Sequence, residues 1–382
     1  MPKIRVMVVD DAVVVRRMVS DVLASDPDLE VAATAPNGRI ALAKIPQVNP
    51  DLITMDVEMP EMNGLETLKE LRKTHPMLPV IMFSTQTQRG ASATLDALSL
   101  GATDYVTKPA NVGSVAEGMQ RLREQLIPKI RLYCKSKIQA SASISIRPSA
   151  TPKGEAGGMR MASAGNSMVE LLAVGVSTGG PNALAELLPQ LPGDLPVPVV
   201  IVQHMPPVFT QLLANRLDAQ CAIRVHEGMA GGKLTPGHAW IAPGDFHMSI
   251  LNATTSKMLT LHQGPPENSC RPAVDVLFRS AVESYGSGVL GVILTGMGRD
   301  GLRGCERIHE AGGQILAQDE ASSVVWGMPG FVARAGLAEK VLPLKEMAQE
   351  IVRRVQRGRS RNSVHVVPSR PGSEKLRSES CR

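Results

Sequence analysis

The sequence predicts two α/β domains in series, and two observations carry this prediction. Short apolar runs alternate with amphipathic stretches of helical period in two separate parts of the chain. Between them, residues 134–168 are rich in Ser, Ala, Gly and Pro, the composition of a flexible linker. We therefore expect a domain over residues 1–126, a linker over 127–168, a second domain over 169–356, and a basic, disordered tail over 357–382.

The first domain is predicted to be a five-stranded parallel (βα)5 sheet. Apolar runs predict strands at residues 4–9, 29–35, 52–56, 79–84 and 104–107. Strands joined by crossover helices form a parallel sheet covered on both faces, with ligands at the carboxyl ends of the strands. Polar residues stand at four of these ends: Asp10 and Asp11, then Asp56, then Ser84, then Lys108.

These polar residues predict a phosphoryl site. Asp10, Asp11 and Asp56 would repel one another without a cation, and carboxylate oxygens suit Mg²⁺. Asp56 can act as a nucleophile toward a phosphoryl donor, while Lys108 and the Ser84 hydroxyl can bind phosphoryl oxygens. Taken singly, the aspartates could be helix caps and the lysine an ordinary surface residue. The complete set at the ends of the right strands favours the phosphoryl site.

The first domain resembles the response-regulator receiver domains of bacterial signalling over about residues 4–126. The resemblance rests on VVDD at residues 8–11, Asp56 followed by Met59, Pro60 and Gly64, Ser84, and TKP at residues 107–109. It implies that a histidine kinase phosphorylates Asp56, and that Ser84 and Tyr105 rearrange as a pair on phosphorylation.

The second domain is predicted to be another mostly parallel α/β sheet. Apolar runs predict strands at residues 171–177, 197–203, 222–227, 238–244 and 288–295, and helices opened by Pro181 and over residues 208–220 and 273–284. Residues 247–252 and 256–262 suggest an antiparallel hairpin added to this sheet.

Ser177 is the candidate nucleophile of the second domain. It ends a strand inside Gly175-Val-Ser-Thr-Gly179, and Pro181 follows at the start of a helix. Glycines allow a sharp turn, and a helix N-terminus offers free N–H groups to an oxyanion. On this motif alone, a glycine-rich turn with an incidental serine is an equal alternative. A P-loop is less favoured because its Lys-Ser/Thr ending is missing.

A reactive serine needs a base and an orienting acid. His204 directly follows the strand at residues 197–203, which places it at the same sheet edge as Ser177. Asp300 lies in the glycine-rich turn after the strand at residues 288–295. The remaining candidates are predicted to be surface or structural histidines and helix-capping aspartates: His226, His238, His247, His262, Asp245, Asp275 and Asp319.

The chain order Ser177, His204, Asp300 differs from the serine, acid, histidine order of α/β-hydrolases. Together with the receiver, the second domain resembles the chemotaxis response-regulator protein-glutamate methylesterases over nearly all of residues 169–344. The resemblance rests on GVSTGGP at 175–181, QHMPP at 203–207, RPAVDVLF at 271–278, LTGMGRDG at 294–301 and EASSVVWGMP at 320–329.

This resemblance implies hydrolysis of γ-glutamyl methyl esters on chemoreceptors, with release of methanol, and deamidation of receptor glutamines. Ser177 would be the nucleophile, His204 the general base and Asp300 its orienting carboxylate. Thr178, Met297 and Arg271 would serve the oxyanion or the substrate, and the ester chemistry would need no cofactor. Relatives often carry a histidine where Cys270 stands. The resemblance also implies that the unphosphorylated receiver covers the active site.

Charge and composition exclude several other classes of protein. Of the net charge of +5, residues 134–168 supply +4 and residues 353–382 supply +7, so the rest of the chain carries −6. A basic nucleic-acid groove is therefore disfavoured. No apolar run approaches the roughly 20 residues of a membrane span, and the five cysteines show no paired spacing. We expect a cytoplasmic monomer without disulfides or zinc.

Three alternative functions differ in class. A DNA-binding response regulator would need a compact helical output domain with a basic recognition helix, which the second domain does not resemble. A catalytically silent adaptor would use the receiver alone, although the presence of all three triad positions argues against it. An esterase of the same chemistry could also serve a chemosensory array that does not control motility. The last two alternatives stay open.

Overall fold

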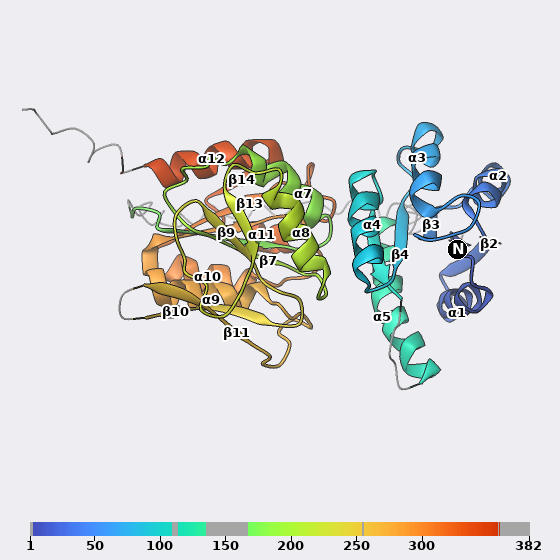
Figure 1. Ribbon diagram of the computed structural model, residues 1–382, viewed down its shortest axis with the longest axis horizontal. Helices are drawn as coiled ribbons and strands as arrows, with labels where there is room; N and C mark the ends of the chain where they lie inside the picture. The colour runs from blue at the N-terminus through green and yellow to red at the C-terminus, as the bar shows by residue number, and fades with distance from the viewer. Residues whose placement is uncertain (1–2, 109–113, 135–166, 254–255, 358, 360–382) are drawn as a thin grey trace, which may run out of the picture.

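The computed structural model describes residues 3–108, 114–134, 167–253, 256–357 and 359. Two α/β domains lie side by side, with helices α4 and α5 of the first facing the second (Figure 1). Most of the predicted linker and nearly all of the predicted tail lie outside the described residues. No helix within the described ranges is long and apolar enough to cross a membrane.

The first domain is the predicted parallel five-stranded sheet, in the order β2-β1-β3-β4-β5. Its strands are β1 (Ile4–Val9), β2 (Leu29–Ala35), β3 (Leu52–Asp56), β4 (Val80–Ser84) and β5 (Asp104–Thr107). Its helices are α1 (Val13–Ala24), α2 (Gly38–Val48), α3 (Gly64–Thr74), α4 (Gln88–Ser99) and α5 (Val115–Tyr133). Helices α1 and α5 cover one face of the sheet, and α2, α3 and α4 cover the other.

Helix α5 extends past the predicted domain end at residue 126. Its Leu126, Ile127 and Ile130 are buried in the core that the helix shares with α1. Burying a large aliphatic side chain contributes about 1.5–3 kcal/mol, which holds residues 127–133 in the helix. The first residues of the predicted linker are therefore helical.

The second domain is built on a seven-stranded parallel sheet, in the order β14-β13-β12-β6-β7-β9-β8. Its strands are β6 (Leu171–Val176), β7 (Val199–Gln203), β8 (Arg224–Glu227), β9 (His238–Ile241), β12 (Val289–Ile293), β13 (Gln314–Gln318) and β14 (Lys340–Leu342). Its α-helices are α7 (Gly180–Leu187), α8 (Phe209–Asp218), α9 (Val274–Tyr285), α10 (Leu302–Glu310), α11 (Met328–Arg334) and α12 (Leu344–Gln356), and two short 3-10 helices are η1 (Leu188–Gln190) and η2 (Gly286–Gly288).

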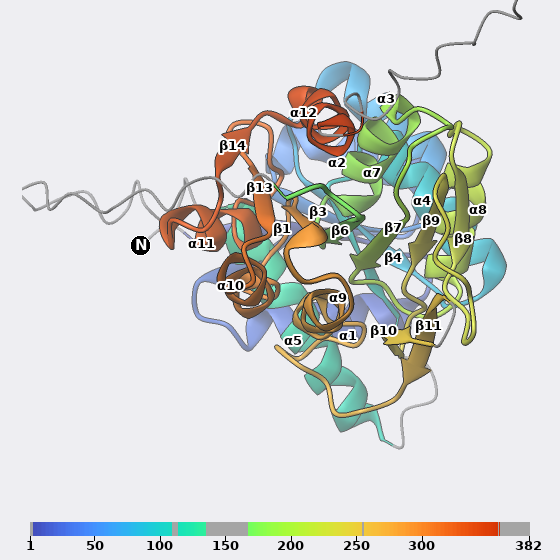
Figure 2. The ribbon, with the colours of Figure 1, turned by 90° about the vertical axis from the view of Figure 1, so that its left-hand side faces the viewer.

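The helices of the second domain form two layers. Helices α7, α8 and α12 pack on one face of the sheet, and α9, α10 and α11 pack on the other (Figure 2). Strand β6 stands between β7 and β12 in the sheet. The chain first builds the sheet on one side of β6, with β7, β8 and β9, and then on its other side, with β12, β13 and β14. In open α/β sheets, ligands bind in the crevice at such a switch point.

The antiparallel hairpin of β10 (His247–Asn252) and β11 (Lys257–His262) is present, but it does not join the large sheet as expected. It forms a separate two-stranded sheet. Its buried side chains Met248, Ile250 and Leu259 belong to the core beneath α9. The backbone N–H of Ile250 also donates to Ser280 Oγ of α9, at 3.1 Å. The hairpin thus covers a helix rather than extending the sheet.

Candidate active site and phosphoryl site

Ser177 lies at the switch point, directly after β6. Its amide donates to Thr295 O at 3.0 Å, and its carbonyl accepts from Gly180 N at 2.8 Å. Gly179 caps α7 in the left-handed region, at φ 79°, which glycine adopts without strain. A Cβ on Gly296 would lie only 2.8 Å from Ser177 Cβ. The close approach of this neighbouring turn to the serine therefore requires glycine at position 296. These contacts hold the serine between two strand ends.

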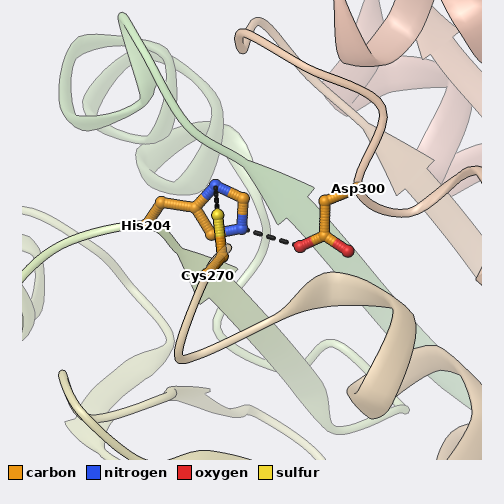
Figure 3. A group of neighbouring side chains, drawn as sticks. All are labelled: His204, Cys270 and Asp300. Atoms are coloured by element: carbon orange, nitrogen blue, oxygen red, sulfur yellow. Dashed lines mark hydrogen bonds and ion pairs between the residues drawn. The ribbon is translucent and has the colours of Figure 1, made fainter. Parts of the chain in front are cut away.

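His204 and Asp300 come together from the ends of β7 and β12. His204 Nε2 lies 2.8 Å from Asp300 Oδ2 (Figure 3). Asp300 is buried and accepts three backbone N–H groups, from Val274 at 2.7 Å, Asp275 at 3.1 Å and Gly301 at 3.0 Å. Burial alone would raise the pKa of Asp300, but the His204 contact and these N–H groups outweigh it and lower the pKa. Asp300 is therefore a fixed, ionised partner for the imidazole.

The second ring nitrogen of His204 contacts a cysteine. Cys270 Sγ lies 3.6 Å from Nδ1, with the sulfur against the ring (Figure 3). Of the described residues, Cys270 and not Ser177 is the hydrogen-bonding partner of this nitrogen. Burial acts to lower the pKa of His204, but hydrogen bonds and charge from Asp300 and Cys270 overcome it and raise the pKa to about 10.

The predicted substrate residues share one cavity of about 940 Å³. Ser177, Thr178, His204, Cys270, Arg271 and Met297 line it on the side of the second domain, and Tyr105 and Lys129 line it on the side of the first. Arg271 is held by Asp245, with Nε 3.0 Å from Oδ1, and donates to Gly264 O at 3.1 Å. The cavity therefore lies at the boundary of the two domains.

One residue beside the candidate triad has a role that sequence reasoning missed. Gln203 ends β7, and its Nε2 donates to Ser177 O at 3.1 Å and to His204 O at 3.2 Å. The side chain thereby ties the serine turn to the histidine turn. Its position next to His204 in the QHMPP motif could have indicated this role. The apolar periodicity alone predicts only that Gln203 is the last residue of a buried strand.

The phosphoryl-site residues of the first domain converge at the ends of β1, β3 and β5. Oxygen atoms of Asp10, Asp11 and Asp56 lie within 4.8 Å of one another. Lys108 Nζ lies 2.7 Å from Asp56 Oδ2 and 2.9 Å from Asp10 Oδ2. Burial raises the pKa of Asp56 to about 6, against the lowering effect of Lys108. This all-oxygen set fits a hard cation such as Mg²⁺.

Ser84 and Tyr105 contact residues outside that acidic cluster. Ser84 Oγ donates to Gly90 O at 3.1 Å and accepts from Thr94 Oγ1 at 2.6 Å, so it is bonded into α4. The Tyr105 ring stacks on Phe209 of the second domain. Ser84 is thus bonded to α4, and Tyr105 contacts the second domain.

Two family descriptions match the chain. "Response regulator receiver domain" matches residues 6–120, and "CheB methylesterase" matches residues 172–351. A protein named protein-glutamate methylesterase/protein-glutamine glutaminase, from Trichodesmium erythraeum, is 55% identical over 355 residues that cover 93% of this chain and 100% of the relative. The chain belongs to the protein-glutamate methylesterase/protein-glutamine glutaminase family.

A second methylesterase/glutaminase, from Nocardioides sp., is 53% identical over 94% of this chain and 97% of its own. The crystal structure of the Thermotoga maritima CheB methylesterase catalytic domain is 40% identical, with a TM-score of 0.48, over 49% of this chain and 99% of that chain. The receiver match coincides with the first sheet of this chain and the esterase match with the second. Ser177, His204 and Asp300 all fall inside the esterase match.

Proposed function

We propose that the chain uses a Ser177–His204–Asp300 triad to hydrolyse γ-glutamyl methyl esters on chemoreceptors, and that phosphorylation of its receiver activates it. The observation that carries this proposal is the His204–Asp300 contact of 2.8 Å beside Ser177 at the switch point. Receptor glutamines are a second substrate of the same site, because amide and ester hydrolysis share an acyl intermediate.

The reaction begins when Ser177 Oγ attacks the ester carbonyl. The Asp300 contact keeps a proton on His204 Nε2, so Nδ1 is the nitrogen that accepts the serine proton. The oxyanion is stabilised by the Met297 N–H and by amides at the start of α7, including Thr178. His204 then gives the serine proton to the leaving methoxide oxygen, which departs as methanol, or to the amide nitrogen of a glutamine, which departs as ammonia. Water, activated by the same Nδ1, hydrolyses the acyl-enzyme to release glutamate.

Formation of the serine–histidine contact requires a small rearrangement. Nδ1 contacts Cys270 in this conformation, whereas catalysis requires it within hydrogen-bond reach of Ser177 Oγ. Catalytic hydrogen bonds are often long in substrate-free enzymes and tighten when substrate binds. The substrate carbonyl enters the cavity lined by Ser177 and Met297, beside Arg271.

Phosphoryl control is proposed to start at Asp56. A chemotaxis histidine kinase supplies the phosphoryl group, Asp56 accepts it, and Lys108 holds a phosphoryl oxygen. Asp10, Asp11 and Asp56 would hold Mg²⁺, which neutralises phosphoryl charge when bound. Ser84 then leaves its partners in α4 to contact the new group, and Tyr105 follows. Because Tyr105 packs on Phe209, its movement weakens the contact that keeps the receiver over the cavity.

Mass spectrometry of receptor peptides tests the reaction itself. We expect glutamyl methyl esters to become glutamates, and receptor glutamines to become glutamates, after incubation with the chain but not with Ser177→Ala. Unchanged peptides in both samples would favour the silent adaptor. Conversion by both would place the nucleophile elsewhere. A strain lacking the gene, assayed for motility, separates a chemotaxis array from another chemosensory array.

A further inference from the structure

The turn at residues 267–270 contacts both members of the candidate His204–Asp300 pair. It does not belong to any of the strand ends that carry the triad. Cys270 N donates to Glu267 O at 2.8 Å, and Glu267 N donates to Cys270 O at 3.1 Å. The two central residues, Asn268 at φ 51° and Ser269 at φ 62°, both lie in the left-handed region. This is the pattern of a type I′ turn, in which Asn is favoured because it tolerates positive φ.

The turn is anchored to helix α9. Arg279 of that helix donates to Glu267 Oε2 at 2.9 Å, which fixes the first residue of the turn. The last residue, Cys270, contacts His204 Nδ1 at 3.6 Å. A tight turn of fixed geometry therefore stands beside the imidazole and leaves the Asn268 side chain directed to the acid.

The Asn268 amide lies between two buried carboxylates. Its Nδ2 donates to Asp300 Oδ1 at 2.9 Å and to Asp275 Oδ2 at 2.9 Å. Asp275 and Asp300 are 1% and 2% exposed, so little solvent screens their repulsion. The second Asp275 oxygen accepts from Gly304 N at 2.7 Å, at the start of α10. One amide group thus serves both acids with its two N–H donors.

Resting on the triad proposed above, we propose that Asn268 is a positioning residue of the esterase reaction. It holds Asp300 where that carboxylate can orient His204, and it separates Asp300 from Asp275. The environments of the two acids agree with this role. The pKa of Asp275 is raised, mainly by burial and in part by the Asp300 charge, while that of Asp300 is lowered. Asp300 stays ionised for His204.

Asn268→Gly removes the amide and keeps a residue that adopts positive φ freely. We expect kcat to fall about 10- to 100-fold with KM changed less than about twofold, because hydrogen bonds to charged groups contribute roughly 1.5–3 kcal/mol. The rise of the rate with pH should move to lower pH, because a loosened Asp300 stabilises the protonated His204 less. Asn49→Gly, the same substitution at an exposed left-handed position after α2, is the control and should keep the parent kcat.

Asn268→Asp places a third carboxylate beside Asp275 and Asp300. We expect a loss of kcat at least as large as that of Asn268→Gly. Adding Asp275→Asn to this variant returns the site to two carboxylates and should restore part of the lost kcat. A purely structural role for Asn268 predicts no such recovery, and a double variant no faster than the single one would contradict electrostatic separation.

NMR titration of His204 gives a readout that does not depend on esterase activity. In Asn268→Gly we expect a lower His204 pKa than in the parent, because a loosened Asp300 stabilises the imidazolium less. If the parent shows no hydrolysis that depends on Ser177, the proposed function is contradicted. The His204 titration would even then test whether Asn268 positions Asp300. An Asn268→Gly variant with the parent kcat, pH profile and His204 pKa would overturn the positioning role, as would a change confined to KM.

Discussion

Tyr105 of the receiver stacks on Phe209 of the catalytic domain, with ring centroids 5.0 Å apart and ring planes inclined by 9°. Phe209 opens helix α8, and only residues 205–208 separate it from His204. The predicted switch tyrosine therefore touches the helix that follows the candidate base. Two polar contacts flank the stack: Asn182 donates to Leu98 O at 2.9 Å, and Arg216 contacts Asp96 at 2.8 Å.

Removing the Arg216 side chain should raise the basal esterase rate. Arg216 also donates to Ser99 Oγ at 3.0 Å, so Arg216→Ala removes two contacts with α4 of the receiver. A partly exposed ion pair contributes roughly 0.2–1 kcal/mol, which corresponds to about a 1.4- to fivefold increase in the open form. The measurement is methanol release without a phosphodonor. Arg224→Ala, which removes an ion pair with Asp218 inside the catalytic domain, is the matched control. Equal rates in both variants would argue against receiver inhibition.

Asp56→Asn should abolish stimulation of the esterase by a small phosphodonor. The amide cannot form the acyl phosphate, although it keeps nearly the shape of the buried carboxylate. We expect the variant to retain the basal rate of the parent and to gain nothing from a phosphodonor with Mg²⁺. Asp51→Asn offers a control at another aspartate of the receiver, outside the acidic cluster. Stimulation that persists in Asp56→Asn would move the phosphoryl acceptor elsewhere.

The pH dependence of the esterase should report the contact between His204 and Cys270. An imidazolium cannot accept the Ser177 proton, and the pKa of His204 is about 10, so kcat/KM should rise with pH toward that value. Cys270→Ala removes one of the groups that raise the pKa, which shifts the rise to lower pH. Ser177→Ala provides the blank for ester hydrolysis by hydroxide, and Cys221→Ala controls for loss of a thiol. A parent rate that levels off near the ordinary histidine pKa of about 6.5 would contradict this account.

Glu350 should stabilise the catalytic domain through a buried charge network. It contacts Arg353 at 2.8 Å, Arg354 at 2.8 Å and Lys340 at 3.1 Å. The hydrogen bond to Arg353, opposed by burial and supported by Arg354 and Lys340, lowers its pKa from 4.5 to about 2. Its stabilisation is therefore present above pH 4.5 and is lost as the pH falls through about 2.

Glu350→Gln should lower the free energy of unfolding by about 1–3 kcal/mol at neutral pH, because Arg354 is left buried with one fewer carboxylate. Urea unfolding at several pH values measures the difference between parent and variant, which should shrink as the pH falls below 4.5. Glu310→Gln, in an exposed pair with Arg307, should change stability by less than about 0.5 kcal/mol. A difference that stays constant down to low pH would exclude the charge of Glu350 as its cause.

The sequence was sufficient to predict the first sheet, five of the seven strands of the second sheet, and the meeting of the candidate triad at one edge. Ser177, His204 and Asp300 each follow an apolar run, and parallel topology brings the ends of such runs together. Strand β14 was missed because it has only three residues, and β13 because a glutamine stands at each end of its short apolar run, QILAQ. The hairpin was predicted, but not its packing on α9, because alternation shows that a strand has a buried face without showing what covers it.

The contacts around the triad could not be predicted in the same way. Asn268 and Cys270 lie in a turn that no periodic pattern marks, and their partners are 32 and 66 residues away in the chain. The sequence Asn268-Ser269 predicts a local turn, but it does not predict which distant residues the turn contacts. Only the folded chain shows that this turn meets Asp300 and His204.

Methanol release from methylated receptor membranes tests whether Ser177 carries an esterase activity that phosphorylation increases. The rate is measured with the parent and with Ser177→Ala, each with and without Mg²⁺ and a small phosphodonor. We expect release by the parent that rises with the phosphodonor, and no release above background by Ser177→Ala. Release that is equal in parent and Ser177→Ala, or absent from both on every receptor preparation, would contradict this expectation.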